Sequence, residues 1–169
     1  MYTKSGAVAT PTRRRDLVGQ DPGLGMLAAQ LLFAVQDELY RRLEAAGYRD
    51  LRPRHGLVLA YLDEQGSRAT ELAALSGRHK QLIGRTVDEL EALGYVTRTP
   101  DPTDRRAKLV VPTPRGRAVM GLSDQIMADL GARGAQAVGP DAYAQFRHTL
   151  QQLIDELRHG RPPGKGQPG

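Results

Sequence analysis

Apolar residues recur at steps of three and four positions from Leu24 to Leu43, and the pattern stops at Ala46 and Gly47. This spacing predicts a long amphipathic helix that ends at a glycine. Similar apolar spacing, with proline, threonine or glycine at the boundaries, predicts five further helices. Their expected ranges are 53 to 65, 70 to 75, 79 to 93, 114 to 131 or 134, and 141 to 158.

Between the fourth and fifth helices the sequence becomes strand-like. The runs "YVTRT" at 95–99 and "KLVVPT" at 108–113 are rich in β-branched residues and predict a hairpin. Their connection, "PDPTDRRAK" at 100–108, holds five charged residues and two prolines, although a tight turn needs only two residues. A solvated loop is the simplest interpretation. The order of elements, four helices, a hairpin and two helices, predicts a mainly α fold.

The length of 169 residues suits one compact domain with tails. Residues 1–23 and 159–169 lack periodicity and are rich in Gly, Pro and charge, so we expect both to be disordered. The run Arg13-Arg14-Arg15 either adds phosphate contacts or keeps the first tail soluble. No stretch matches a membrane helix or a signal peptide, which predicts a soluble, cytoplasmic protein. Cysteine is absent, so disulfides, thiolate metal sites and thiol-oxidation sensing are excluded.

Positive charge is concentrated in one segment of the chain. The formal net charge is +5, and residues 67–117 contain ten Lys or Arg against six Asp or Glu. This third of the chain therefore holds +4 of the +5. The excess favours a polyanionic partner for this segment, although an imbalance of this size is also common on a merely solvated face.

Residues 69–93 have the pattern of a helix-turn-helix, a short helix followed by a glycine turn and a longer helix. If Ile83, Val87 and Leu90 face the core, hydrogen-bond donors crowd the opposite side at the start of the second helix. Polar residues are common there for capping, but caps favour Ser, Thr, Asp or Asn, and cations oppose the helix dipole. We therefore interpret the donors as contacts to the DNA major groove, namely Arg78, His79, Lys80, Gln81 and Arg85.

The segment from Ala69 to Gly116 resembles the MarR family of winged helix-turn-helix transcriptional regulators. The most specific pieces are "VDELEALGYVTR" and "DPTDRRAKLVV", followed by Thr-x-x-Gly at 113–116. Pro112 departs from the Leu usual in the family, which puts the last ladder bond of the wing in doubt. The resemblance implies an interleaved homodimer of six-helix subunits. It assigns 24–50 and 113–158 to dimerisation and 51–112 to DNA binding, with a recognition helix at about 79–93 and a wing at about 95–112.

The same resemblance assigns roles to the residues of the wing tip. Arg106 would read the minor groove, Arg105 would contact a phosphate or the groove, and Asp104 would orient a basic residue of the recognition helix, expected to be Arg85. A guanidinium also suits the negative potential of a narrow minor groove.

The function implied is that of a ligand-responsive repressor that binds a pseudo-palindromic operator. The resemblance implies a small aromatic or anionic effector, for which Tyr40, His55 and Tyr61 are candidates, although each is equally well explained as packing or surface. A nucleoid, RNA-binding or protein-binding winged helix is the alternative.

An enzyme is not indicated by the sequence. The four His have no ligand spacing, and "GKGQ" at 164–167 lacks the earlier glycine and the hydroxyl of a phosphate loop. We therefore expect no catalytic residue, metal or cofactor.

Overall fold

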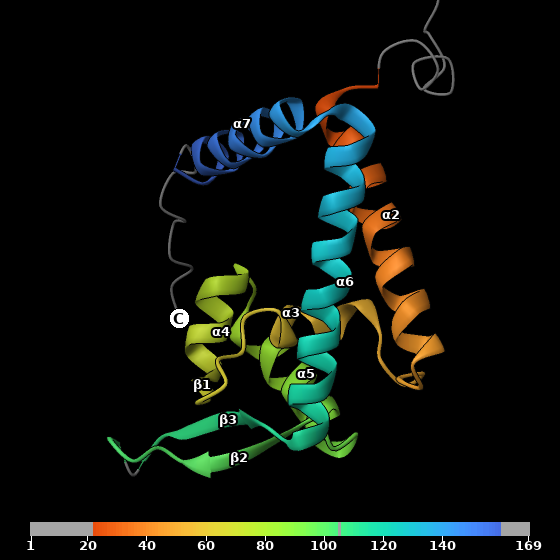
Figure 1. Cartoon of the computed structure of the whole chain (residues 1–169). Helices are drawn as coiled ribbons and strands as arrows, with labels where there is room; N and C mark the ends of the chain where they lie inside the picture. Colours follow the sequence, from red (N-terminus) through yellow and green to blue (C-terminus); the bar gives the residue numbers. More distant parts are fainter. Residues whose placement is uncertain (1–21, 105, 160–169) are drawn as a thin grey trace, which may run out of the picture. The chain divides into compact units, whose positions relative to one another are not determined.

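A computed structural model of the chain describes residues 22–104 and 106–159. Figure 1 shows the helices and strands along the chain. The chain divides into two compact units, residues 1–38 and 39–169. Helix α2, Leu24–Ala45, begins in the first unit and ends in the second. It ends as predicted, because Gly47 follows with a φ of 98°, a backbone conformation that favours glycine.

The second predicted helix is shorter than expected. A 3-10 turn η1, Pro53–His55, continues into α3, Gly56–Leu59, and regular structure stops there. The Asp63 side chain accepts a hydrogen bond from the backbone N–H of Gln65 at 2.7 Å, and the N–H of Gly66 donates to the Asp63 carbonyl. Such a local turn competes with helix formation, which accounts for the early end.

The helix-turn-helix follows the prediction closely. Helix α4, Ala69–Ser76, ends at Gly77, which has a left-handed conformation with φ 65°. Helix α5, Lys80–Ala92, ends at Leu93 before Gly94. Both helices contribute to one core, in which Leu72, Ile83 and Val87 have no exposed surface.

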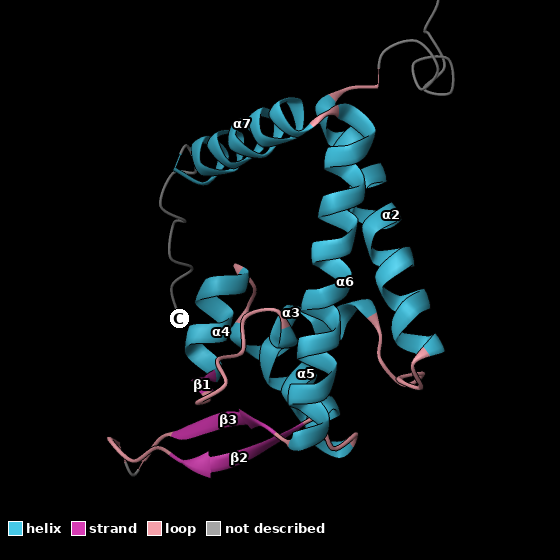
Figure 2. Ribbon diagram, viewed as in Figure 1, coloured by secondary structure: helices cyan, strands magenta, loops and turns pink. Residues whose placement is uncertain are grey.

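The wing is a three-stranded antiparallel sheet in the order β1, β3, β2 (Figure 2). Strands β2, Val96–Pro100, and β3, Lys108–Pro112, form the predicted hairpin. Strand β1, Ser67–Arg68, was not predicted, because two residues are too few to form a pattern. Pro112 pairs in register with Val96 at the very end of the ladder, where the missing N–H of a proline is tolerated.

Helix α6, Pro114–Val138, begins as predicted, with the Thr113 hydroxyl accepting a hydrogen bond from the N–H of Gly116. Its predicted end near Gly131 or Gly134 is wrong, because the helix continues to Val138. Both glycines lie against Tyr143: a Cβ at Gly134 would meet its ring at 2.9 Å, and a Cβ at Gly131 would meet its hydroxyl at 3.3 Å. These glycines are packing positions that let α7, Pro140–His159, approach α6.

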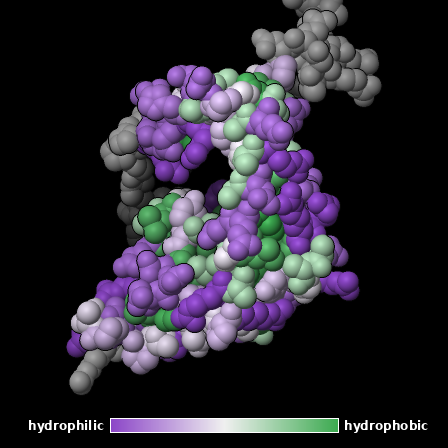
Figure 3. Space-filling model, in the orientation of Figure 1, coloured by the Kyte–Doolittle hydropathy of each residue, from purple (hydrophilic) through white to green (hydrophobic). Residues whose placement is uncertain are grey.

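The buried core joins the end of α2, α3, α4, α5, the sheet and the first half of α6. Its apolar members are Leu43, Leu51, Val58, Leu62, Leu72, Ala73, Ile83, Val87, Leu90, Tyr95, Val96, Val110, Val119 and Ile126. Helix α7 contributes none of them: its apolar residues Phe146, Leu153 and Leu157 are exposed, and the side of α7 visible in Figure 3 is hydrophilic. Among the described residues, no helix is long and apolar enough to cross a membrane.

Candidate nucleic-acid interface

The start of α5 presents an exposed row of hydrogen-bond donors. Ile83, Val87 and Leu90 are fully buried, so the opposite side of the helix faces outward. All five predicted donors are exposed, and none of their side chains has a hydrogen-bond or ion-pair partner within the described part of the chain: Arg78, His79, Lys80, Gln81 and Arg85. His79 stands at the cap position without making a capping hydrogen bond. Helix capping therefore does not explain these polar residues.

Two further residues of α5 complete this face. Leu82 is 41% exposed and lies among the charged residues of this face. Gly84 has open space around it, and a Cβ built there meets no other atom within 4 Å. No other helix of the described chain packs against Gly84, so a second surface is free to approach the helix at this point.

The acidic residues of α5 all pair with partners from other elements. Arg98 on β2 pairs with Asp88 at 2.6 Å and also with Glu91. Glu89 accepts hydrogen bonds from Arg54 at 2.6 Å and from the buried His55 at 3.0 Å. These contacts keep the pKa of Glu89 below its ordinary value, the bond from Arg54 first and that from His55 second. The exposed start of the helix thus retains its positive charge without a compensating acid nearby on α5.

The loop between β2 and β3 is organised by Asp101, which is only 5% exposed. Its Oδ1 accepts hydrogen bonds from the Thr103 N–H at 2.8 Å and the Thr103 hydroxyl at 2.7 Å. Its Oδ2 accepts a hydrogen bond from Nε of Arg68 at 2.7 Å. The bonds from Thr103, followed by those from Arg68, hold the pKa of Asp101 at about 2. Asp101 therefore remains a carboxylate at neutral pH.

Asp104 does not pair with Arg85 as the sequence led us to expect. Its Oδ2 lies 3.9 Å from Arg68, and its Oδ1 accepts a hydrogen bond from the backbone N–H of Arg106 at 3.1 Å. Arg106 itself is exposed. The predicted contact residue Arg105 lies outside the described residues. Sequence reasoning thus missed both Arg68 and Asp101, the residues that fix this loop.

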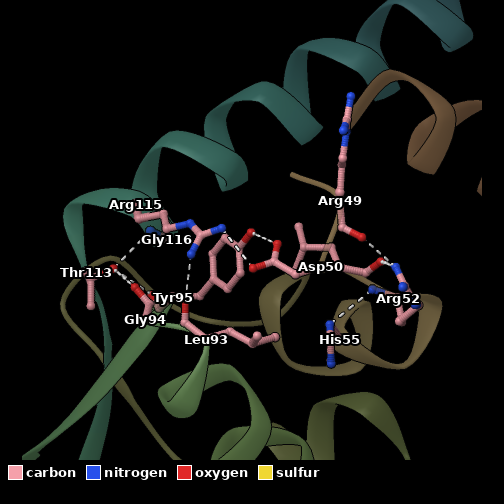
Figure 4. A network of polar contacts seen from close by, with 11 residues as sticks. Arg49, Asp50, Arg52, His55, Leu93, Gly94, Tyr95, Thr113, Arg115 and Gly116 are labelled. Carbon is pink, nitrogen blue, oxygen red and sulfur yellow. Dashed lines mark hydrogen bonds and ion pairs between the residues drawn. The ribbon is translucent and has the colours of Figure 1, made fainter. Parts of the chain in front are cut away.

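A second polar network joins the end of α5 to the start of α6 (Figure 4). The hydroxyl of the buried Tyr95 donates to Asp50 at 2.5 Å, and Arg115 lies over the Tyr95 ring at 4.3 Å while pairing with Asp50 at 2.9 Å. Arg115 also donates to the carbonyl of Leu93 at 2.8 Å. Burial and the bond to Asp50 raise the pKa of Tyr95, so its hydroxyl keeps its proton and remains a donor.

The Thr-x-x-Gly motif belongs to the same network. Thr113 donates from its hydroxyl to the carbonyl of Gly94 at 2.7 Å, and from its N–H to the carbonyl of Tyr95 at 3.0 Å. A Cβ at Gly116 would overlap that same Tyr95 carbonyl. The motif therefore packs the start of α6 directly against Gly94 and Tyr95, which follow α5.

The three candidate effector contacts lie in different environments. His55 is fully buried, and its Nδ1 accepts the Arg52 N–H at 3.1 Å while Nε2 bonds to Glu89. Tyr40 is half-buried beside Gly56, and burial raises its pKa. Tyr61 is exposed. One surface hollow on α6 and another on α7 contain none of the three. Both ring nitrogens of His55 are thus occupied by structural contacts.

These features define a class. A helix-turn-helix with exposed donors at the start of its second helix, followed at once by a small sheet whose loop is held in place, is a winged-helix DNA-binding fold. Within the described residues, no group of three or more His, Asp or Glu is placed to hold a metal ion.

Comparisons with known proteins agree with this class. A family model described as MarR family matches residues 49–107. The structure of CouR from Rhodococcus jostii RHA1 bound to p-coumaroyl-CoA is 30% identical, covers 76% of this chain and 90% of its own, and has a TM-score of 0.62. No curated protein sequence matches the chain.

Two further structures extend the likeness. The transcriptional repressor CouR bound to a 23-mer DNA duplex is 25% identical over 78% of this chain and 92% of its own, with a TM-score of 0.65. A MarR-family transcriptional regulator from Rhodococcus sp. RHA1 is 29% identical over 79% and 96%, with a TM-score of 0.61. The chain belongs to the MarR family of winged helix-turn-helix transcriptional regulators.

Proposed function

We propose that this regulator is a ligand-responsive repressor that binds a pseudo-palindromic operator as a homodimer. The observation that carries the proposal is the row of exposed donors on α5, which have no partner within the described chain, next to a wing that is already fixed. Buried or paired donors would contribute little to DNA binding, whereas free donors at a helix start are suited to the edges of bases in the major groove.

The DNA contacts divide between two grooves. In the major groove we assign Lys80, Gln81 and Arg85 to base edges, since Lys or Arg suits guanine and Gln suits adenine, and Arg78 and His79 to the flanking backbone. We assign Arg106 to the minor groove, with Asp104 setting the backbone of Arg106 through the bond to its N–H. Arg105 remains a proposed phosphate or groove contact.

Leu82 adds an apolar contact to the major-groove set. A leucine that is 41% exposed among charged residues suits the C5-methyl group of a thymine. We therefore expect at least one thymine in each half-site, placed so that its methyl group meets Leu82.

Dimerisation is assigned to residues 24–50 and 113–158. Two sets of exposed apolar side chains support this division, one on the first unit and one on α7: Leu24, Leu27, Leu31, Leu32 and Phe33, and Phe146, Leu153 and Leu157. A single helix-turn-helix covers few base pairs, and a dimer places two copies about one helical turn apart.

The effector is proposed by analogy with CouR, whose structure contains p-coumaroyl-CoA. That ligand combines an aromatic ring with anionic phosphates, which agrees with the small aromatic or anionic effector expected from the sequence. Of the three candidate contacts, Tyr40 and Tyr61 remain available, whereas both ring nitrogens of His55 are engaged.

Selection of bound sequences from random duplexes tests the proposal. At fixed salt, the selected pseudo-palindrome should bind about 10³-fold more tightly than random DNA, and a half-site alone should bind far more weakly than the full site. Equal binding to all sequences would favour the alternative, a nucleoid-coating winged helix. Preference for RNA would also contradict the proposal.

We further propose that the chain is not an enzyme and that it works in the cytoplasm, where its DNA target lies. The solved structures similar to it are those of transcriptional regulators, which supports the first point. An activity that depends on any of the four His would contradict it.

A further inference from the structure

Arg68 occupies a junction between the helix-turn-helix and the wing. It is the second residue of β1, where it pairs in register with Leu109 of β3, and it is also the residue that immediately precedes α4. Its backbone N–H donates to Glu71 at 2.9 Å. The backbone of Arg68 is therefore fixed at both sides, and its side chain extends from a rigid base.

The side chain of Arg68 reaches both acids of the wing loop. Nε and Nη2 lie 2.7 Å and 2.5 Å from Oδ2 of Asp101, and Nη1 lies 3.9 Å from Oδ2 of Asp104. These contacts, the hydrogen bond to Asp101 first, raise the pKa of Arg68 above its already high value. One guanidinium thus contacts two carboxylates that are three residues apart, and its single positive charge balances one of their two negative charges.

Asp101 links this ion pair to the internal structure of the loop. One of its oxygens accepts both Thr103 bonds, and the other accepts Arg68. Its backbone N–H donates to the Ala107 carbonyl at 3.1 Å, and the Ala107 N–H donates to the Asp104 carbonyl at 2.9 Å. The loop therefore closes on Asp101, and Arg68 is the contact that attaches the closed loop to the body of the domain.

We propose that Arg68 is a positioning residue for DNA recognition, which acts through Asp101 and Asp104 to hold the wing tip where Arg106 enters the minor groove. This inference rests on the proposed function. Arg68 also lowers an electrostatic penalty, because it balances one of the two negative charges that the wing loop would otherwise bring near the phosphates of the bound duplex. Its side chain is about one third exposed, so it need not touch DNA to have this effect.

The geometry requires arginine and not only a positive charge. A planar guanidinium offers donors on several edges, and here it serves Asp101 with two nitrogens and Asp104 with a third. A lysine presents a single ammonium and cannot span both acids in this way. Arg68→Lys should therefore recover the charge but only part of the positioning.

A double-mutant cycle with Arg106 tests the proposal. Binding of the full-length dimer to its selected operator is measured by fluorescence anisotropy for wild type, Arg68→Ala, Arg106→Ala and the double variant. Each single change should weaken binding about 10- to 100-fold. The double variant should bind the operator at most about threefold more weakly than the weaker-binding of the two single variants. The two residues are not in contact, so a role of Arg68 in fold stability alone would give effects that multiply. Multiplying effects, or normal binding by Arg68→Ala, would overturn the proposal.

Two further variants guard against unfolding and non-specific charge effects. Arg68→Lys should remain folded and bind between wild type and Arg68→Ala, and it replaces Arg68→Ala in the cycle if that variant does not fold. Arg117→Ala removes an exposed positive charge on α6 and should change the affinity less than threefold. A loss in Arg117→Ala equal to that in Arg68→Ala would mean that charge alone matters.

Amide hydrogen exchange separates failure of this proposal from failure of the proposed function. In the free dimer, Arg68→Ala or Arg68→Lys should accelerate exchange of the Asp104 and Ala107 amides at least about tenfold, while the amides of α5 keep their wild-type rates. If wild type selects no operator, the proposed function fails, and unchanged exchange of the loop then overturns the positioning role as well. If wild type binds its operator and the loop amides are unaffected, only the positioning role is overturned.

Discussion

The two DNA-contacting parts proposed here, the start of α5 and the wing loop, are held in place by different forces. Helix α5 is positioned by apolar burial, with Ile83, Val87 and Leu90 fully inside the core. The wing loop has no such anchor and is positioned by one buried carboxylate, Asp101, and its partner Arg68. The backbone of a helix satisfies its own hydrogen bonds, so the side chains at the start of α5 stay free for DNA, whereas the wing loop uses charged side chains to fix its conformation.

The largest expected effect comes from removing part of the apolar burial that positions α5. Ile83→Ala removes a fully buried side chain from under the recognition helix and should lower the free energy of unfolding by about 2 to 5 kcal/mol. Urea denaturation measures the change. Leu75→Ala on α4 is the matched control, because Leu75 is 55% exposed, and it should cost under about 1 kcal/mol. A similar loss in both variants would contradict the assignment of the core.

Changes on the polar side should affect DNA binding more than folding. Arg106→Ala should lower operator affinity by about 1 to 3 kcal/mol with little change in the free energy of unfolding, because the side chain is exposed and makes no hydrogen bond or ion pair with the described residues. Anisotropy titration and urea denaturation of the same samples measure both quantities. Unchanged affinity for the selected operator would refute the minor-groove role.

Leu82 offers a smaller test on α5 itself. Replacing the contacted thymine by uracil removes one methyl group, which should cost wild type about 1 kcal/mol of binding free energy. The Leu82→Ala variant should bind the two duplexes equally. Scanning each thymine of the selected half-site in turn locates the contact. If no position distinguishes wild type from the variant, Leu82 does not contact a thymine methyl.

The smallest expected effect is a change in the stability of the folded protein that is seen only in acid. The pKa of Asp101 is about 2 in the folded protein against an ordinary value of 3.8, so the folded state favours its ionised form. The resulting stabilisation is complete above about pH 4 and disappears as the pH falls through 2. Thermal denaturation of wild type should lose stability over this interval. The loss should be smaller in Asp101→Asn, and equal losses in both proteins would contradict the role of this carboxylate.

The elements with long-range periodicity were predictable from the sequence. Helices α2 and α5 and the start of α6 follow from apolar spacing together with Gly47, Gly94 and Thr113. The end of α6 was not predictable. A glycine that ends a helix and a glycine that makes room for a neighbouring ring cannot be distinguished in the sequence alone. Gly134 belongs to the second kind, and only the position of Tyr143 reveals it.

The hydrogen-bond donors of the candidate site were predictable from the sequence, but the residues that hold the wing loop in place were not. The charged residues of α5 and Arg106 were evident from their place beside apolar faces and in the loop. Asp101 and Asp104 both appear as loop acids, and the sequence does not show which one is buried. The series Asp101-Pro102-Thr103 does favour a turn in which the aspartate accepts the N–H two residues on, and this signal could have singled out Asp101. Arg68, 33 residues away, carried no signal at all.

The pairing of the acids on α5 has a consequence for the speed of binding. Counted alone, α5 has two basic residues, Lys80 and Arg85, against three acids, yet Arg98, Arg54 and His55 cover those acids. The helix therefore presents to an approaching duplex a positive start and an end where Arg98 and Arg54 balance two of the three negative charges. Such a field exerts a torque on the encounter complex and turns the helix start toward the phosphates before contact, which raises the association rate at low salt and loses this effect as salt screens the field.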